Sequence, residues 1–162
     1  MTRSELLDAY LAEPQMVEKR LSGLPPEVLH FKPTPESWSV HEIIVHLADS
    51  EASGYIRCFK IIAEPGSDVT AYDQDKWTDI LKGRERSTQN ALGLLKALRV
   101  SAHEVLSGVS GEAWDQQVNH PEHESYTLSD WLGSYIDHIK GHLSQIDRNL
   151  ADWEKAGKPA TV

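Results

Sequence analysis

The sequence has little cysteine, no long apolar run and no excess of basic charge. Its single cysteine, Cys58, excludes an internal disulfide and a cysteine-rich zinc finger. No stretch approaches the roughly 18 apolar residues that cross a bilayer, and the first ten residues lack the apolar core of a secretory signal. Sixteen basic residues against 25 acidic ones give a net charge of −9, which argues against electrostatic binding of nucleic acid. We therefore expect a cytoplasmic protein with no membrane or nucleic-acid partner.

Common motifs of nucleotide and serine-hydrolase chemistry are also missing. The sequence contains no GxxxxGK phosphate loop, no GxGxxG fingerprint and no GxSxG elbow. Its 162 residues, 40% hydrophobic and 25% charged, are typical of a globular chain, and we expect residues 1–162 to form a single domain. The unusual feature of the composition is histidine, which occurs eight times.

Helical periodicity runs through four long segments, and no segment alternates clearly with period two. The four segments are residues 4–21, 40–62, 87–106 and 128–150. Ser39 with Glu42 predicts a capping box at the start of the second segment, and Thr127 caps the fourth. Pro14 predicts a kink or restart in the first, and residues 108–126 are expected to be irregular. Four amphipathic helices predict an all-α four-helix bundle, and the long connectors after the first two helices make a crossover plausible.

Three of the histidines suggest a metal site. His138 and His142 are four residues apart and therefore share one face of the fourth helix. Random placement of eight histidines gives about 0.4 such pairs, so two ordinary helix histidines remain an alternative. His46 lies beside the apolar stripe of the second helix and needs a partner if it is buried. Three neutral imidazoles from facing helices favour zinc, nickel, copper or iron and leave open coordination positions, which is typical of a catalytic site.

The catalytic residues are less well defined. Glu42 and Asp49 lie within one turn of His46, so either could orient an imidazole or move a proton, although each could equally be a solvated charge. His123 lies in the segment before the fourth helix and is a weaker candidate, since a solvated polar loop is the simpler interpretation. His41 is expected to face solvent.

Three segments resemble the motifs of a known family. Residues 36–51, with Trp-Ser-Val, then a Glu and His-Leu, resemble the segment that opens helix two in the DinB-like (DinB/YfiT) superfamily. Residues 72–77 are similar to its mid-chain motif, and residues 127–146 to its closing HxxxH helix. The resemblance implies an up-down-down-up four-helix bundle with a long crossover between helices two and three. It also implies a divalent metal, typically zinc or nickel, on His46, His138 and His142, and a homodimer.

The resemblance also implies chemistry at that metal. Characterised members include enzymes in which the metal binds a low-molecular-weight thiol such as bacillithiol or mycothiol. The expected function is therefore metal-dependent thiol S-transfer with a small-molecule substrate. Two alternatives remain open: a metal-dependent hydrolase that uses metal-bound water, and a non-catalytic metal-binding stress protein.

Overall fold

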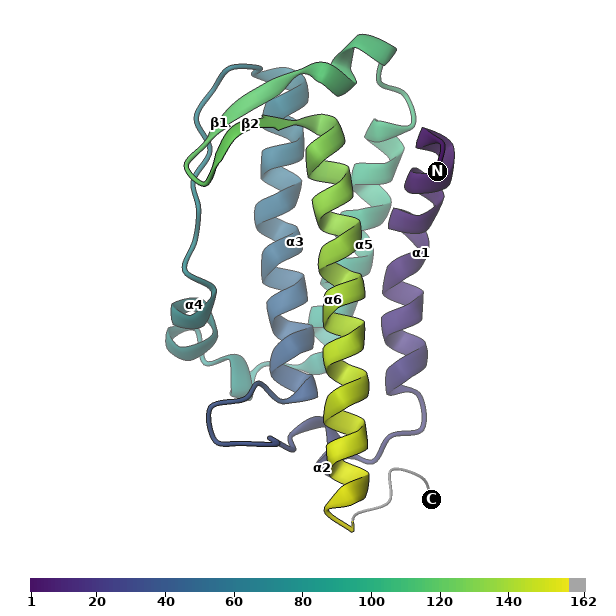
Figure 1. Ribbon diagram of the computed structural model, residues 1–162, viewed down its shortest axis with the longest axis vertical. Coiled ribbons are helices and arrows are strands. Elements are labelled where there is room, and N and C mark those ends of the chain that lie inside the picture. Colours follow the sequence, from purple (N-terminus) through teal and green to yellow (C-terminus); the bar gives the residue numbers. More distant parts are fainter. Residues whose placement is uncertain (158–162) are drawn as a thin grey trace.

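Four long helices lie side by side in the computed structural model, which describes residues 1–157 (Figure 1). They are α1 (Arg3–Leu21), α3 (Val40–Ala63), α5 (Thr88–Leu106) and α6 (Leu128–Lys155). The shorter elements that connect them are α2 (Pro26–Leu29), α4 (Gln74–Ile80), η1 (Gly83–Glu85), η2 (Gly111–Asp115), β1 (Gln117–His120) and β2 (His123–Thr127). None of the helices in residues 1–157 combines the length and the apolar character that a membrane span requires.

The order of directions confirms the predicted up-down-down-up bundle. Helices α3 and α5 run parallel, since His41 near the start of α3 contacts Thr88 at the start of α5, and Tyr55 contacts Ser101 further along both. The chain returns along the full length of the bundle between them, through residues 64–87, with α4 on the way (Figure 1). Helices α1 and α6 run in the opposite direction. The long crossover therefore lies between the second and third long helices, as expected.

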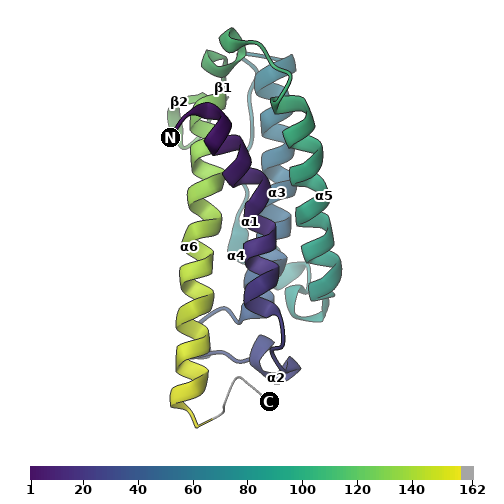
Figure 2. The same ribbon diagram turned by 90° about the vertical axis from the view of Figure 1, so that its right-hand side faces the viewer.

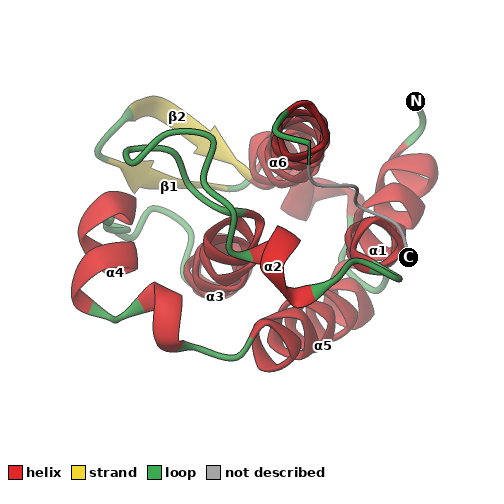
Figure 3. Cartoon of the chain, turned by 90° about the horizontal axis from the view of Figure 1, so that it is seen from below, coloured by secondary structure: helices red, strands yellow, loops and turns green. Residues whose placement is uncertain are grey.

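The shorter elements cover one side of the bundle. Helix α3 packs against α5 and α6, and α1 packs against the same two helices, so that α1 lies between α6 and α5 (Figure 2). Viewed along the bundle, α4 and the β1–β2 hairpin lie beside α3, on the side away from α1 (Figure 3). The elements that can cover a site between α3 and α6 are therefore the crossover and the hairpin.

Local side-chain signals explain where the long helices begin. The hydroxyl of Ser39 accepts from the amide of Glu42, whose carboxylate in turn accepts from the amide of Ser39. Thr127 and Asp130 form the same capping box at the start of α6. Each box satisfies two amides that the first turn of a helix leaves without partners. Both predicted helix starts are confirmed.

A buried arginine connects all four long helices. Arg99 of α5 is 0% exposed and donates to Glu13 of α1 (2.7 Å) and Glu51 of α3 (2.9 Å). It also donates to the carbonyls of Tyr10 in α1 (2.8 Å) and Tyr135 in α6 (2.9 Å). The apolar interior forms two large clusters, one around Trp131 and Tyr10 and another around Ile43 and Ile139. Cys58 is buried in the first cluster, as a small core residue rather than a ligand.

One expectation about local structure was wrong, and one of two alternatives expected at Pro14 is excluded. Residues 108–126 are not an irregular loop, because they contain η2 and an antiparallel hairpin of β1 with β2. The alternation in β1 covers only four residues, with Val118 and His120 buried, which is too short to stand out as a period-two pattern. At Pro14, where a kink or a restart was expected, there is no restart, since α1 continues unbroken from Arg3 to Leu21.

Candidate metal centre

His46 of α3 meets His138 and His142 of α6 between the two antiparallel helices. The Nε2 atom of His138 lies 3.1 Å from Nε2 of His46 and 3.1 Å from Nε2 of His142. Among the described residues, these three offer one ligand atom each, all within 4.8 Å of one another. His46 is buried, and the other two are half-buried. The structure therefore brings together the three histidines that the sequence singled out.

The three imidazoles are neutral near pH 7. Burial lowers the pKa of His46 to about 3 and that of His138 to about 4, and repulsion between the neighbouring rings adds to both shifts. Burial also lowers the pKa of His142. Oε1 of Gln145 lies 2.9 Å from Nδ1 of His142, which assigns the proton to Nδ1 and leaves the Nε2 lone pair free. Neutral imidazole is the form that ligates a metal.

The donor set fits a divalent transition metal. Imidazole nitrogens about 2.0–2.1 Å from a tetrahedral zinc lie about 3.3 Å apart, close to the two separations of 3.1 Å seen here. Three lone pairs that converge on one point repel one another, and a cation between them would remove that repulsion. Nitrogen ligands of this kind suit zinc, nickel, copper or iron.

Trp38 closes one side of the histidine cluster. Its ring centroid lies 4.8 Å from that of His46 and 6.3 Å from that of His142, with the latter pair stacked. The side-chain amide of Asn149 on α6 donates to the Trp38 carbonyl oxygen, with 2.8 Å between Nδ2 and the oxygen. This hydrogen bond holds the tryptophan backbone against α6. This role of Trp38 was not predicted, because its only signal in the sequence is its position just before the cap of α3.

The cluster opens into a pocket of about 450 Å³, a volume that suits a small molecule. The residues that line it are His46, Ser50, Arg57, Ala71, Tyr72, Asp73, Gln74, Glu122 and His138. A pocket of about 190 Å³ shares four of these residues and adds part of the hairpin; its lining is Ser50, Arg57, His120, Glu122, His123, Tyr126, Ser134, Tyr135 and His138. The crossover and the hairpin therefore complete walls that begin on α3 and α6, while the three histidines come from the bundle.

The two carboxylates that were candidate bases are engaged elsewhere. Glu42 accepts from Nε of Arg84 (2.8 Å) and from Nζ of Lys32 (3.3 Å). Asp49 forms a bidentate ion pair with Arg86, at 2.6 and 2.8 Å. Neither carboxylate lines the two pockets beside the histidine cluster. The geometry therefore gives both of them a role in holding the crossover against α3.

The ion pairs of Glu42 predict a specific pH dependence of stability. Burial alone would raise its pKa, but hydrogen bonds from Ser39, Arg84 and Lys32 lower it to about 2. The charged carboxylate therefore stabilises the fold above about pH 4.5, and this contribution is lost as the pH falls toward 2. At pH 7 we expect Glu42→Gln to lower the free energy of unfolding by about 1–3 kcal/mol in urea denaturation.

The pH series separates this explanation from a simple packing defect. The difference between wild type and Glu42→Gln should shrink as the pH is lowered from 4.5 toward 2. Glu104→Gln, at an exposed position of α5, is the matched control and should differ little from wild type at any pH. A deficit of the same size at pH 7 and pH 2.5 would contradict the ion-pair explanation.

Two other histidines have positions that the sequence did not predict. His41 does not face solvent: it is 1% exposed, with Nε2 2.8 Å from the Gly83 carbonyl oxygen and Nδ1 2.6 Å from the Thr88 hydroxyl oxygen. That expectation was wrong because the crossover folds back over the start of α3. His123 lies on β2, stacked on Tyr126, and lines the smaller pocket together with His138. It comes close to the cluster without joining it.

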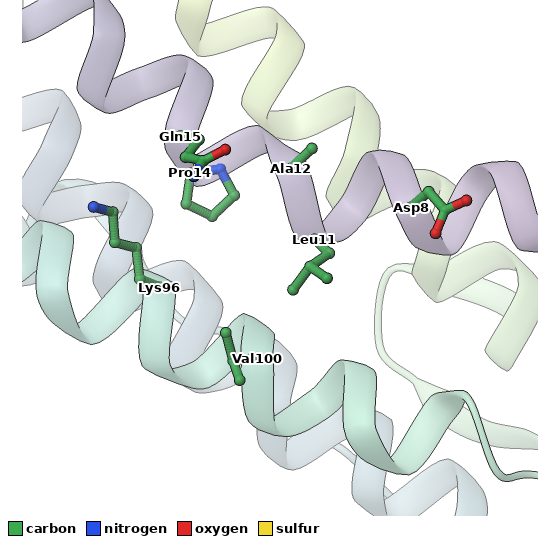
Figure 4. A pocket seen from close by; sticks show the side chains of 7 residues that line it. All are labelled: Asp8, Leu11, Ala12, Pro14, Gln15, Lys96 and Val100. Carbon is green, nitrogen blue, oxygen red and sulfur yellow. The ribbon is translucent and has the colours of Figure 1, made fainter.

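A further pocket, of about 430 Å³, lies between α1 and α5 (Figure 4). Its lining residues are Asp8, Leu11, Ala12, Pro14, Gln15, Lys96 and Val100. Lys96 is paired with Glu18, and the lining contains no histidine or cysteine. We therefore place the chemistry at the histidine cluster.

The homodimer expected from the family resemblance stays a prediction.

A four-helix bundle with three convergent neutral histidines beside an open pocket defines a candidate metalloprotein. Residues 9–146 match the family model of the DinB superfamily, and the chain belongs to that superfamily. A protein of Oceanobacillus iheyensis, named as a proposed metal-dependent hydrolase, is 29% identical over 133 residues, which are 82% of this chain and 77% of that protein. YfiT of Bacillus subtilis, named in the same way, is 27% identical over 110 residues, which are 67% of this chain and 62% of YfiT.

Solved structures support the same fold. The structure of Bacillus subtilis YfiT, described as a probable metal-dependent hydrolase with an unusual four-helix bundle topology, matches with a TM-score of 0.87 and 20% identity. That match covers 98% of this chain and 91% of YfiT. A mycothiol-dependent maleylpyruvate isomerase matches with a TM-score of 0.72 and 13% identity, over 90% of this chain and 61% of the isomerase. At these identities the likeness shows the fold.

Proposed function

We propose that this protein is a metal-dependent enzyme that transfers a low-molecular-weight thiol to an electrophile. The observation that carries the proposal is the convergence of His46, His138 and His142 beside an open pocket of about 450 Å³. Three protein ligands with an accessible face are typical of catalytic rather than structural sites. A divalent transition metal such as zinc or nickel, when bound there, lowers the pKa of a coordinated thiol or water.

The protein residues around the cluster have separate roles in this proposal. The three histidines hold the metal, and Gln145 orients His142 by accepting from Nδ1. Trp38 packs against the rings of His46 and His142 and does not line the large pocket. Thiol transfer requires no side-chain base to ionise the thiol, because a coordinated thiol is already deprotonated. The engagement of Glu42 and Asp49 with arginines is consistent with this chemistry.

Hydrolysis is the second candidate, and one observation favours it. Glu122 lines both pockets and has no ion-pair partner among the described residues, so its carboxylate is available to accept a proton from water. The names of the relatives from Oceanobacillus iheyensis and Bacillus subtilis support the same reading. A non-catalytic metal-binding role is less consistent with a cluster that opens into a pocket of this size.

A spectroscopic titration tests the proposal. Elemental analysis of protein purified without an affinity tag should find close to one divalent metal per chain. Cobalt-substituted protein titrated with 2-mercaptoethanol should then develop a thiolate-to-metal charge-transfer band, and His138→Ala treated in the same way should not. Stoichiometric metal without such a band would overturn thiol transfer and favour hydrolysis. No metal, even after reconstitution, would overturn both.

A further inference from the structure

Arg57 lies on the wall of both pockets beside the histidine cluster. It follows His46 by eleven residues, or three turns of α3, so the two residues lie on the same face of the helix, with their Cα atoms about 16 Å apart along its axis. The larger pocket contacts both residues, and the smaller one contacts Arg57 and His138. A molecule that fills the larger pocket therefore reaches from the metal ligands to this arginine.

Arg57 is unlike the other arginines that are shielded from solvent. In residues 1–157, Arg86 and Arg99 are the other arginines that are not exposed, and each pairs with carboxylates. Arg57 forms no ion pair with any side chain that the structure describes, and its one described hydrogen bond runs from Nη2 to the Thr70 carbonyl (2.7 Å). Its Nε atom is buried without a hydrogen-bond partner. A buried donor without an acceptor costs about 1–3 kcal/mol, so this side chain lacks a partner that it needs.

The surroundings of Arg57 favour one carboxylate over a more highly charged anion. Tyr72 lines the larger pocket and Tyr126 the smaller one, and both can donate a hydroxyl hydrogen. Asp73 and Glu122 also line the larger pocket, and their negative charges oppose a dianion such as a phosphate monoester. A single carboxylate matches the planar edge of one guanidinium and accepts from two of its N–H groups.

We propose that Arg57 binds a carboxylate of the substrate whose reactive sulfur is held at the histidine cluster. The position of the sulfur rests on the proposed function, whereas the carboxylate subsite depends only on residues of this chain. The thiol substrate is therefore a carboxylate-bearing molecule long enough to reach from His46 to Arg57. Arg57 sets specificity for that group, and it does not take part in bond making or breaking.

The first arm of the test needs no metal. Nitrogen-15-labelled full-length protein is titrated with hexanoate, and separately with neutral hexanamide, while the arginine Nε–H resonances are recorded. One resonance, identified by its absence in Arg57→Gln, should shift saturably with hexanoate and stay fixed with hexanamide. Arg148→Gln, which changes an exposed arginine, should behave as wild type. If that resonance moves in Glu122→Gln but not with hexanoate, Arg57 pairs with Glu122 and the proposal is overturned.

The second arm uses cobalt-substituted protein and two thiols that differ only in the terminal group, 6-mercaptohexanoate and 6-mercaptohexanol. Wild type should bind the carboxylate at least tenfold more tightly in the charge-transfer titration, and Arg57→Gln should lose this preference with unchanged affinity for the alcohol. Equal binding of the two thiols by wild type overturns the subsite and leaves thiol transfer standing. A hexanoate shift at Arg57 without any thiolate band supports the subsite and overturns thiol transfer.

Discussion

Alanine in place of His46, His138 or His142 is expected to abolish high-affinity metal binding while the helical bundle stays folded. Each residue supplies one of three nitrogen donors that converge within 4.8 Å. Removal of an outer partner of a metal ligand already weakens binding by about 10–100-fold, so loss of a ligand itself should exceed about 100-fold. Elemental analysis and a competitive zinc titration measure the loss, and far-UV circular dichroism verifies the helix content.

The three variants should behave alike, since each removes one of the three nitrogen donors. His103→Ala is the matched control, because His103 lies on α5, outside the cluster. The one hydrogen bond described for its side chain is with Ser107. Full metal content in His103→Ala together with loss in the other three would support the assignment. Retention of full stoichiometry in two of the three cluster variants would contradict it.

The parts of this fold that the sequence predicts are those determined within a few residues. The capping boxes of Ser39 and Thr127 act over one turn, so they locate the starts of α3 and α6 without any knowledge of the tertiary structure. The spacing of His138 and His142 likewise places both on one helix face. To include His46 in the predicted site, one further assumption is needed, namely that a facing helix supplies the third ligand.

The pocket beside the cluster depends on contacts between distant segments and was not predicted. Its walls combine Arg57 of α3 with Tyr72 of the crossover and Glu122 of the hairpin. No local pattern shows that the crossover returns along α3, and the same omission led to the wrong solvent-facing placement of His41. The strand that contains Val118 is stabilised by its pairing with β2 and by a bridge from Asp68 to Asn119, both of which are tertiary.

The role of Arg99 was equally hidden, and its removal should have the largest effect on stability. In the sequence it is one more charge on an amphipathic helix, yet it is 0% exposed and binds α1, α3 and α6 at once. Arg99→Met is expected to lower the free energy of unfolding by about 3–5 kcal/mol, because Glu13 and Glu51 then lie buried without a counter-charge. Urea denaturation at pH 7 measures the loss.

The pH dependence of this deficit identifies its cause. Burial raises the pKa of Glu13 to about 7 and that of Glu51 as well, even with Arg99 opposing both shifts. Without Arg99 the folded state holds these protons still more tightly, so the variant should gain stability relative to wild type as the pH falls toward 4.5. Adding Glu13→Gln and Glu51→Gln to Arg99→Met should recover much of the loss, whereas exposed Arg148→Met should change stability by less than about 0.5 kcal/mol. A deficit that neither the lower pH nor the neutral glutamines reduce would show that packing, rather than charge, is what Arg99 contributes.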